Sequence, residues 1–192
     1  MERLYVSTHN RDKLSELRQL LGENVEILHP GDDDPDVEET GTTLWENALL
    51  KARAGFERTG IPTIADDTGL EVDVLDGAPG VYAARFAGPD ATYADNRNKL
   101  VKSVEAFPEE ERTARFRIVI AYVDSEQELR FDGVLEGHIL ATPRGENGFG
   151  YDPVFQPEGD SRTLAELNAD EKNKISHRGR ALRAFLTWWN NR

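Results

Sequence analysis

The stretch RLYVSTHNRDKLSELRQLL, residues 3 to 21, carries the first indication of the fold. Its first five residues predict a short strand, because apolar and aromatic side chains dominate them. After a polar turn, four leucines between positions 14 and 21 recur at the spacing of one face of an amphipathic helix. A strand, a polar turn and a helix in this order is the unit from which α/β folds are built.

The rest of the chain continues this alternation. Thr43 and Glu46 have the spacing of a capping box, so a helix should begin there, and Gly60 should end it. Ser176 should cap a last helix that carries Leu182 and Phe185 on one apolar face. We expect strands over 25–28, 63–67, 70–75, 114–123 and 129–140, helices over 43–59, 94–106 and from 177 onward, and a glycine-rich loop over 145–151. The sequence therefore predicts an α/β protein with a mixed sheet.

Composition narrows the class of protein. The 192 residues suffice for one domain with a buried core, and 38% of them are hydrophobic. Cysteine is absent, so disulfides, thiolate metal sites and cysteine nucleophiles are excluded. No stretch approaches the roughly 18 uninterrupted apolar residues of a membrane helix, and the chain starts without a signal-peptide pattern. We therefore expect a cytoplasmic protein.

The net charge of −13 comes from 36 acidic and 23 basic residues. Such a surface repels nucleic-acid backbones and anionic membranes, so we expect neither as a partner. Dense carboxylates are also typical of proteins from a high-salt cytoplasm, where salt screens their repulsion. An ordinarily acidic protein is the alternative to this halophilic interpretation.

The polar loop STHNRDK, residues 7 to 13, is a candidate phosphate site. Backbone N–H groups at a helix N-terminus are unpaired donors that the helix dipole reinforces. Asn10 can cap the helix, Thr8 can donate a hydroxyl, and Lys13 adds a positive charge one turn in. A capped helix with surface charges is the alternative. The pattern GxxxxGK[ST] is missing, so this loop is not a P-loop.

Two groups of carboxylates follow. Asp66 and Asp67 end the expected strand 63–67, where α/β folds place their sites, and desolvating two like charges is costly unless a cation is present. Mg²⁺ prefers such oxygen ligands. A turn with surface aspartates is the alternative. Most acidic residues of the loop 32–40 should be solvated, but Glu39 directly precedes the helix that carries Lys51.

Two further segments point to an anionic, planar ligand. No acidic residue occurs from Lys172 to Arg192, which makes this segment a positive island suited to a polyanion. A cationic helix C-terminus explains only part of it, since we expect residues 172–178 to precede or open the helix. Glycines on either side of Phe149 would let its ring approach a planar ligand closely, with a structural glycine loop as the alternative.

Taken together in this order, these segments resemble the inosine/xanthosine triphosphate pyrophosphatase family of enzymes for non-standard purine nucleotides. The similarity runs from Thr8 to Arg178. It rests on T-x-N-x-x-K from Thr8, EETGTTLWENALLKA from 38, IADDTGLEVDVLDGAPGVYAARF from 64, GFGYDPVF from 148 and EKNKISHRGRAL from 171. The resemblance implies an elongated mixed sheet flanked by helices, with two lobes and a central active-site cleft. It also implies a single two-lobed domain over 1–192 and a homodimer.

The resemblance further implies Mg²⁺-dependent hydrolysis of ITP, dITP and XTP to the monophosphate and pyrophosphate, which cleanses the nucleotide pool. Asp67 would be the main catalytic residue and bind Mg²⁺ with Glu39, and Asp66 and Lys51 would complete the catalytic residues. The substrate residues implied are Thr8, Asn10, Arg11, Lys13 and Lys51 for the triphosphate, Thr68 beside the substrate, Phe149 stacked on the purine, and Gly150, Tyr151, Asp152, Lys172, His177 and Arg178 around the base. His9 departs from a glycine common in the first motif. Asp12 places a negative charge there, so we expect it to face solvent.

Three alternatives differ from this interpretation. A pyrophosphatase for modified pyrimidines is disfavoured by GFGYDPVF and by the Ser-His-Arg run at 176–178. A non-catalytic nucleotide sensor would not need the Asp66–Asp67 pair or Lys13. A nucleic-acid-binding module conflicts with the charge of −13. Hypoxanthine and xanthine carry a carbonyl group at C6, where adenine carries an amino group, so hydrogen-bond donors such as Arg178 and His177 would disfavour adenine. How guanine is excluded does not follow from the sequence.

Overall fold

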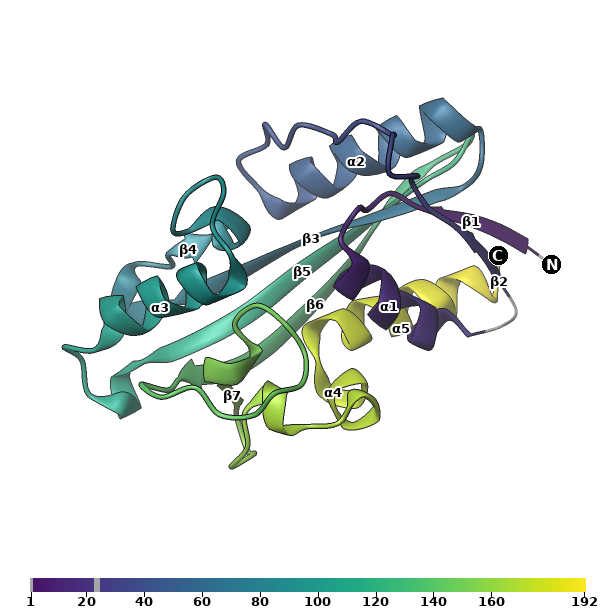
Figure 1. The fold of residues 1–192 in the computed structure, drawn as a ribbon. Coiled ribbons are helices and arrows are strands. Elements are labelled where there is room, and N and C mark those ends of the chain that lie inside the picture. Colours follow the sequence, from purple (N-terminus) through teal and green to yellow (C-terminus); the bar gives the residue numbers. More distant parts are fainter. Residues whose placement is uncertain (1, 23–24) are drawn as a thin grey trace. The chain divides into compact units, whose positions relative to one another are not determined.

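The computed structural model describes residues 2–22 and 25–192 (Figure 1). Strands and helices follow one another along these residues as the sequence predicted, with seven strands and five α-helices in all. The short strands Pro79–Gly80 and Phe155–Pro157 were not predicted. In chain order they are β1 (Glu2–Val6), α1 (Arg11–Leu21), β2 (Val25–Leu28), α2 (Leu44–Thr59), β3 (Thr63–Val72), β4 (Pro79–Gly80), α3 (Tyr93–Val104), β5 (Thr113–Val123), β6 (Glu128–Ile139), β7 (Phe155–Pro157), α4 (Ala169–Ile175) and α5 (His177–Trp189).

The strands form one mixed sheet in the order β2-β1-β3-β5-β6-β7, and β4 pairs with β3 off this path. β1 is parallel to β2 and to β3, whereas β4 and β7 run antiparallel to their partners β3 and β6. The α/β class and the mixed sheet are therefore confirmed.

β3 corrects one expectation. The sequence predicted two strands, over 63–67 and 70–75, but a single strand runs from Thr63 to Val72 and a short 3-10 turn follows it over Asp73–Leu75. Thr68 and Gly69 do not interrupt the extended backbone. Asp66 and Asp67 consequently lie in the middle of a long strand and not at its end.

The chain forms two compact units. The first unit comprises residues 1–67, 118–133 and 178–192, and the second comprises residues 68–117 and 134–177. One boundary lies directly after His177, the first residue of α5, and the others fall inside β3, β5 and β6. Each of these three strands therefore contributes residues to both units.

In the first unit, helices pack on both faces of the strands. α1 and α5 cover one face, where Leu17 and Phe185 pack against Ile64 and Ile120 (Figure 1). α2 covers the other face, where Ala48 and Ala52 pack against residues of β3 and β5. The capping box at Thr43 and Glu46 starts α2, and Gly60 ends it in a left-handed conformation with φ 66°, both as predicted.

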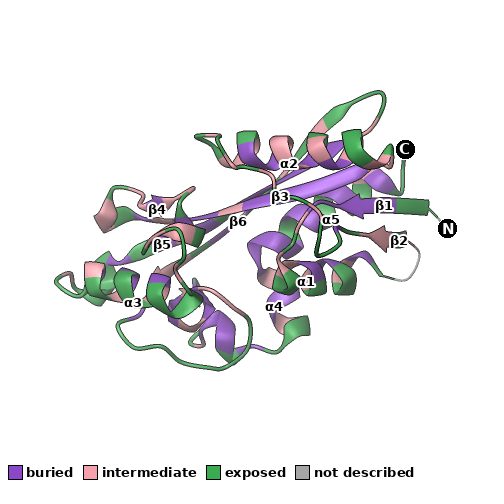
Figure 2. Cartoon of the chain, turned by 45° about the horizontal axis from the view of Figure 1, so that its top comes forward, coloured by how far each residue is buried: buried purple, intermediate pink, exposed green. Residues whose placement is uncertain are grey.

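The second unit has its own core of buried residues, among them Leu70, Leu100, Phe155 and Leu164. Colouring by burial shows that β3 is buried along most of its length (Figure 2). α3 begins after Thr92, whose side chain forms a capping box with Asp95. The helix thus starts one residue before, and ends two residues before, the range that we predicted.

α4 was not predicted. Asn168 caps it and forms a capping box with Glu171, so Lys172 and Lys174 lie in its last turn. These lysines precede α5 as expected, but they also end α4, so the helix dipole favours both of them and our expectation that positive charge is disfavoured there is wrong. Only His177 and Arg178 open a helix, since α5 begins directly after Ser176. Among the described residues, no helix has the length and apolar content needed to cross a bilayer.

Candidate functional site

The carboxylates of the first unit lie where one strand ends and its neighbour continues. β1 pairs with β3 as far as Val6 and Ile64, and the Ser7 amide donates to the Ile64 carbonyl at 2.9 Å. β3 then runs on through Asp66 and Asp67. The two aspartates therefore follow the carboxyl end of β1, which is the edge at which open α/β sheets bind ligands.

Asp66 is held by cations from two distant parts of the chain. Its Oδ2 lies 2.9 Å from Lys13 Nζ, on α1, and 3.4 Å from Arg178 Nη2, on α5. Arg178 also donates through Nη1 to Glu16 Oε2 at 2.5 Å. Asp66 and Arg178 are each only 2% exposed at the side chain, so this is a desolvated ionic network.

Asp67 has different partners, which lie on α2 and in the loop before it. Asn47 donates through Nδ2 to Asp67 Oδ2 at 3.1 Å. Lys51 Nζ lies 3.8 Å from Asp67 Oδ1 and 2.5 Å from Glu39 Oε1. A single ammonium group therefore stands between the two carboxylates that the resemblance proposed as metal ligands.

The two aspartates face opposite sides of the sheet. Successive residues of a strand point in opposite directions. Asp66 follows the direction of Ile64, toward α1 and α5, whereas Asp67 follows Ala65, toward α2. Lys13, Glu16, Glu39, Lys51, Asp66, Asp67 and Arg178 are called the ionic set below.

The surroundings shift the pKa values of the two aspartates in opposite directions. Burial acts to raise the pKa of Asp66, but Lys13 and Arg178 outweigh it and hold the value far below its usual range. Burial, assisted by Glu39, raises the pKa of Asp67 despite the opposing effect of Lys51. Neighbouring positions thus combine a carboxylate that stays ionised with one that accepts a proton more readily.

The donor chemistry around Lys51 fits a hard cation that also binds phosphate. Among residues 2–22 and 25–192, no group of three or more acidic or histidine side chains is arranged to hold a metal ion. Glu39 and Asp67 nevertheless both approach one positive charge, the Lys51 ammonium. Mg²⁺ is commonly bound by one or two carboxylates with water and substrate phosphates completing its shell. These two residues fit that pattern.

The loop before α1 is folded as predicted in one respect. The Asn10 side chain accepts from the backbone N–H groups of Asp12 and Lys13, both at 3.0 Å, and so caps the helix. The Asn10 amide in turn donates to the Thr8 hydroxyl at 3.2 Å. Asp12 is exposed, as expected. The cap thus occupies two of the helix N–H groups that we expected to bind phosphate. The cation that reaches Asp66 comes from Lys13, in the first turn of α1.

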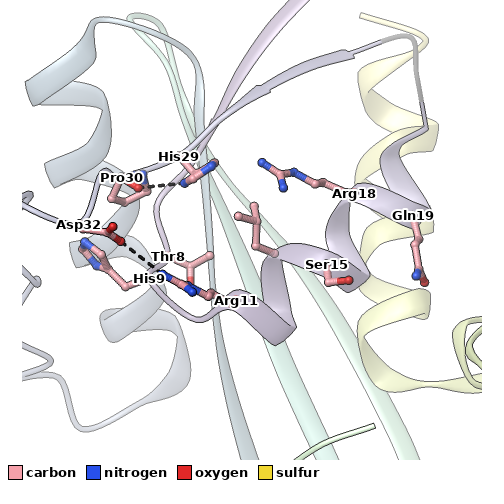
Figure 3. A pocket seen from close by; sticks show the side chains of 10 residues that line it. Thr8, His9, Arg11, Ser15, Arg18, Gln19, His29, Pro30 and Asp32 are labelled. Atoms are coloured by element: carbon pink, nitrogen blue, oxygen red, sulfur yellow. Dashed lines mark hydrogen bonds and ion pairs between the residues drawn. The ribbon is translucent and has the colours of Figure 1, made fainter. Parts of the chain in front are cut away.

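Arg11 lies apart from Lys13. It pairs with Asp32 at 3.6 Å, and both side chains are almost fully exposed. Arg11 and Thr8 line a cavity of about 560 Å³ beside α1, together with His9, Arg18, His29 and other residues (Figure 3). The structure therefore brings Lys13 and Arg178 to the carboxylates, but not Arg11.

In the second unit, Phe149 lies within a compact set of contacts. Its backbone amide donates to Asp152 Oδ2 at 2.9 Å, and Lys172 donates to the same oxygen at 2.5 Å. The Lys172 ammonium lies 5.0 Å from the centre of the Phe149 ring, and the ring of Tyr93 lies 5.7 Å away. Tyr93, Phe149, Asp152 and Lys172 are called the aromatic set below.

Two glycines shape the loop that carries Phe149. Gly148 has φ 70°, and a Cβ there would meet Asp152 Oδ2 at 2.1 Å. Gly150 has φ 62°, and its carbonyl accepts from Arg97 at 3.0 Å. Only glycine combines this backbone conformation with the close approach to Asp152.

Three other predicted residues belong to the second unit. Tyr151 donates its hydroxyl to the Ala83 carbonyl at 2.7 Å, which is a structural contact in the core. The His177 ring stacks on Phe116 at 4.6 Å. Thr68 is half-buried on β3.

Sequence analysis missed Glu16, Asn47 and Tyr93. Glu16 follows Lys13 by three residues and therefore shares its side of α1, so helical spacing could have identified it. Asn47 is a fully buried polar residue inside a helix, which is unusual and needs a partner. Tyr93 carries no local signal, because its position beside Phe149 depends on tertiary packing.

Comparison with known proteins decides the family. A family model described as the Ham1 family matches residues 4–188. The chain belongs to the Ham1 family. The match covers β1 from Leu4 onward, every later strand that the structure describes, all residues of both sets and nearly the whole of α5.

Curated relatives and solved structures agree with this placement. The chain is 52% identical over 187 residues to a dITP/XTP pyrophosphatase of Caldanaerobacter subterraneus subsp. tengcongensis, covering 95% of this chain and 93% of that protein. It is 44% identical to a dITP/XTP pyrophosphatase of Coxiella burnetii, covering 97% and 96%. The structure of a HAM1 protein from Coxiella burnetii superposes with a TM-score of 0.90 at 41% identity, over 100% of both chains. The Staphylococcus aureus Ham1 protein gives a TM-score of 0.88 at 33% identity, over 99% of both chains.

Proposed function

We propose that this Ham1 protein hydrolyses dITP, ITP and XTP to the nucleoside monophosphate and pyrophosphate. The observation that carries the proposal is the ionic set, in which two buried carboxylates are each paired with a lysine that can also bind phosphate. The substrate assignment is supported by the dITP/XTP pyrophosphatase relatives that match nearly the full chain. Its role in the cell would be to remove these nucleotides from the pool.

The cations of the ionic set are the proposed triphosphate ligands. Lys13 and Lys51 are mostly buried, with 16% and 14% of their side chains exposed. Each is paired with a carboxylate of the set. Phosphate oxygens can take the place of these carboxylates as acceptors, since both carry negative charge and accept charge-assisted hydrogen bonds. Arg178 supplies a third charge, and it stays fixed by Glu16 at the same time.

Glu39 and Asp67 are the proposed magnesium ligands. When bound there with phosphate oxygens, Mg²⁺ neutralises charge that develops during phosphoryl transfer. Lys51, which contacts both carboxylates, would then pair with phosphate. Asp66 keeps Lys13 and Arg178 in place and stays ionised because its pKa is low.

Asp67 is also the proposed acceptor of the proton from the attacking water. In the protein without a bound cation, burial raises the pKa of its carboxyl above the usual value. A carboxylate held beside the substrate can take a proton from water. Asp67 Oδ2 is held by Asn47, and this contact fixes the orientation of the group. Positioning of the water and neutralisation of charge are the chief demands of this reaction.

The aromatic set is the proposed binding site of the purine base. Phe149 offers a half-buried ring for stacking, and Lys172 lies beside it as a hydrogen-bond donor. A donor at this place favours the C6 carbonyl of hypoxanthine and xanthine over the amino group of adenine. Sequence analysis gave this role to Arg178 and His177 as well. Arg178 lies with the carboxylates of the first unit, so we now assign it to phosphate.

Product analysis tests the proposed function. The enzyme with Mg²⁺ should convert XTP and dITP into the monophosphate and pyrophosphate, with little turnover of ATP. Release of orthophosphate in place of pyrophosphate would identify a phosphatase. Tight binding of XTP without any product would identify a nucleotide sensor, and equal turnover of ATP and XTP would remove the base specificity.

Three further expectations belong to this proposal. We propose a homodimer, which light scattering of the purified protein would detect as twice the 21.6 kDa chain mass. We also propose a cytoplasmic location and adaptation to salt, the latter from the net charge of −13. Activity and melting temperature that rise between 0.1 M and molar KCl would support adaptation to salt, and a steady decline would contradict it.

A further inference from the structure

Asn47 connects the two carboxylates proposed as metal ligands. It is the fourth residue of α2 and is fully buried, with 0% of its surface exposed. Its Nδ2 donates to Asp67 Oδ2 at 3.1 Å, and its Oδ1 accepts from the Gly41 backbone amide at 2.8 Å. Gly41 lies two residues after Glu39. One side chain therefore fixes Asp67 itself and the segment that carries Glu39.

The contact between Gly41 and Asn47 leaves no room for a side chain at position 41. A Cβ on Gly41 would lie 2.6 Å from Asn47 Oδ1 and 2.6 Å from the Cβ of Glu46. Its φ is not in the left-handed region, so the demand is for space and not for an unusual backbone conformation. Any side chain at position 41 would thus push the loop away from Asn47.

A similar local pattern occurs at α3, but there the asparagine does not bond to a carboxylate. Thr43 to Asn47 reads Thr-Leu-Trp-Glu-Asn, and Thr92 to Asn96 reads Thr-Tyr-Ala-Asp-Asn. Both stretches form a capping box, and both asparagines are buried fourth residues of their helices. Asn96, however, bonds only to backbone groups, accepting from the Ala87 amide at 2.7 Å and donating to the Ala84 carbonyl at 2.9 Å.

This difference separates a structural role from a functional one. An asparagine that ties a helix to the preceding loop needs only backbone partners, as at Asn96. Asn47 instead bonds to one backbone group, the Gly41 amide, and to one side chain, the carboxylate of Asp67 on β3. Groups that hydrogen-bond to metal ligands orient them, and their loss typically costs about 10- to 100-fold in metal affinity or activity.

We infer that Asn47 is a positioning residue for divalent-cation binding, holding Asp67 and the Glu39 segment at the separation that the cation requires. The inference rests on the proposed function and adds a residue to it. In this role Asn47 acts through its hydrogen bonds with Asp67 and Gly41.

The test compares Asn47→Leu with Asn96→Leu, the same substitution in the matched asparagine. Leucine has a similar size and removes both hydrogen bonds. Binding of Mn²⁺, used as a spectroscopic substitute for Mg²⁺, is measured by electron paramagnetic resonance in the presence of pyrophosphate. We expect Asn47→Leu to weaken Mn²⁺ binding about 10- to 100-fold. Asn96→Leu should bind Mn²⁺ as the wild type does, although both variants lose thermal stability.

A second variant keeps the inference testable if Asn47→Leu does not fold. Gly41→Ala changes a partly exposed loop position and leaves Asn47 intact, yet its Cβ breaks the Gly41–Asn47 contact. It should also weaken Mn²⁺ binding and raise the Mg²⁺ concentration needed for half-maximal activity. Unchanged Mn²⁺ binding in Asn47→Leu, or in Gly41→Ala where the former is unfolded, would overturn the inference. Equal weakening in Asn96→Leu would do the same, by showing a general loss of structure.

The outcome is distinguishable from failure of the proposed function. If the wild-type enzyme releases no pyrophosphate from XTP, the proposed function fails whatever the variants do. If the wild type is active and binds Mn²⁺ but the Asn47 and Gly41 variants bind it equally well, only the role of Asn47 fails.

Discussion

The ionic set of the first unit and the aromatic set of the second unit use buried charge in different ways. In the ionic set, Lys13 and Lys51 each pair with carboxylates, and Arg178 adds a third cation. In the aromatic set, the pair of Lys172 with Asp152 lies beside the Phe149 ring. The first arrangement can exchange its internal ion pairs for a polyanion and a cation. The second presents one face and one donor, so it selects the group that stacks there.

This contrast predicts that changes in the two sets have separable kinetic effects. Changes in the ionic set should lower kcat or weaken phosphate binding. Changes in the aromatic set should raise KM and alter base choice. Inorganic triphosphate, which has the phosphates but no base, distinguishes the two.

Replacing Asp67 with asparagine should have the largest effect. Asp67→Asn keeps the size of the side chain but removes the negative charge and the proton acceptor. We expect kcat for XTP to fall about 100-fold or more, because these contributions are worth several kcal/mol. Steady-state kinetics measures the loss, and circular dichroism checks that the fold is retained. A fully active variant would show that the proton acceptor and the cation site lie elsewhere.

Removing the Phe149 ring should affect the base but not the phosphates. Phe149→Ala should raise KM for dITP about 10- to 100-fold, since stacking of a base on an aromatic ring is worth about 1–3 kcal/mol. Its kcat should change little. Inhibition by inorganic triphosphate should stay at the wild-type level. A variant that loses affinity for inorganic triphosphate to the same degree would contradict the division of roles between the two sets.

Lys13→Met should give the converse result. It removes one of the cations proposed to bind phosphate and leaves Asp66 paired with Arg178. Inhibition by inorganic triphosphate should weaken about 10- to 100-fold, because a hydrogen bond to a charged group is worth about 1.5–3 kcal/mol. The ratio of XTP to ATP turnover should not change, because the base site is intact. A changed ratio would mean that Lys13 takes part in base selection.

A charge pair outside both sets should have the smallest effect. Asp73 accepts two hydrogen bonds from Arg115, both at 2.9 Å, in an exposed position of the second unit. Asp73→Asn should cost less than about 1 kcal/mol at pH 7, as exposed ion pairs do. It should leave kcat and KM unchanged, and kinetics with XTP would reveal any departure.

The pH dependence of this pair follows from its pKa. Hydrogen bonds from Arg115 and Thr113 hold the pKa of Asp73 below its usual range. The stabilisation is therefore complete above the unfolded-state pKa of about 4 and is lost as pH falls through the lower folded-state value. Urea unfolding should show the difference between wild type and Asp73→Asn shrinking below about pH 4. An equal difference at pH 3 and pH 7 would contradict the assignment.

Local patterns in the sequence were sufficient for much of the fold. The helix that starts after Thr43 and the cap at Asn10 depend on residues within four positions of each other, and both were predicted. α4 also has a local signal, the Asn168 and Glu171 capping box, but its seven residues show no apolar period to draw attention to it. We predicted two strands in place of β3, because a pair of carboxylates inside a buried strand is unexpected.

The partners of those carboxylates could not be predicted from local patterns. Lys13 and Arg178 are separated by most of the chain, yet both lie at Asp66. The resemblance named most of these residues but not their pairing, and it grouped Arg178 with the residues around the base. The roles of Asn47 and Glu16 were missed because they depend on hydrogen bonds to residues far away in the sequence, Asp67 and Arg178.

Because Asp66 and Asp67 face opposite sides of the sheet, the register of β3 decides which cations each carboxylate meets. Deleting Ala65 would reverse the sides that the two aspartates face, so that Asp67 would point toward α1 and α5 and Asp66 toward α2. Each carboxylate would then meet the other's cations while the composition of the chain stayed almost the same. Natural or engineered length changes in this strand are thus tolerable only in pairs of residues, even where the packing could absorb a single one.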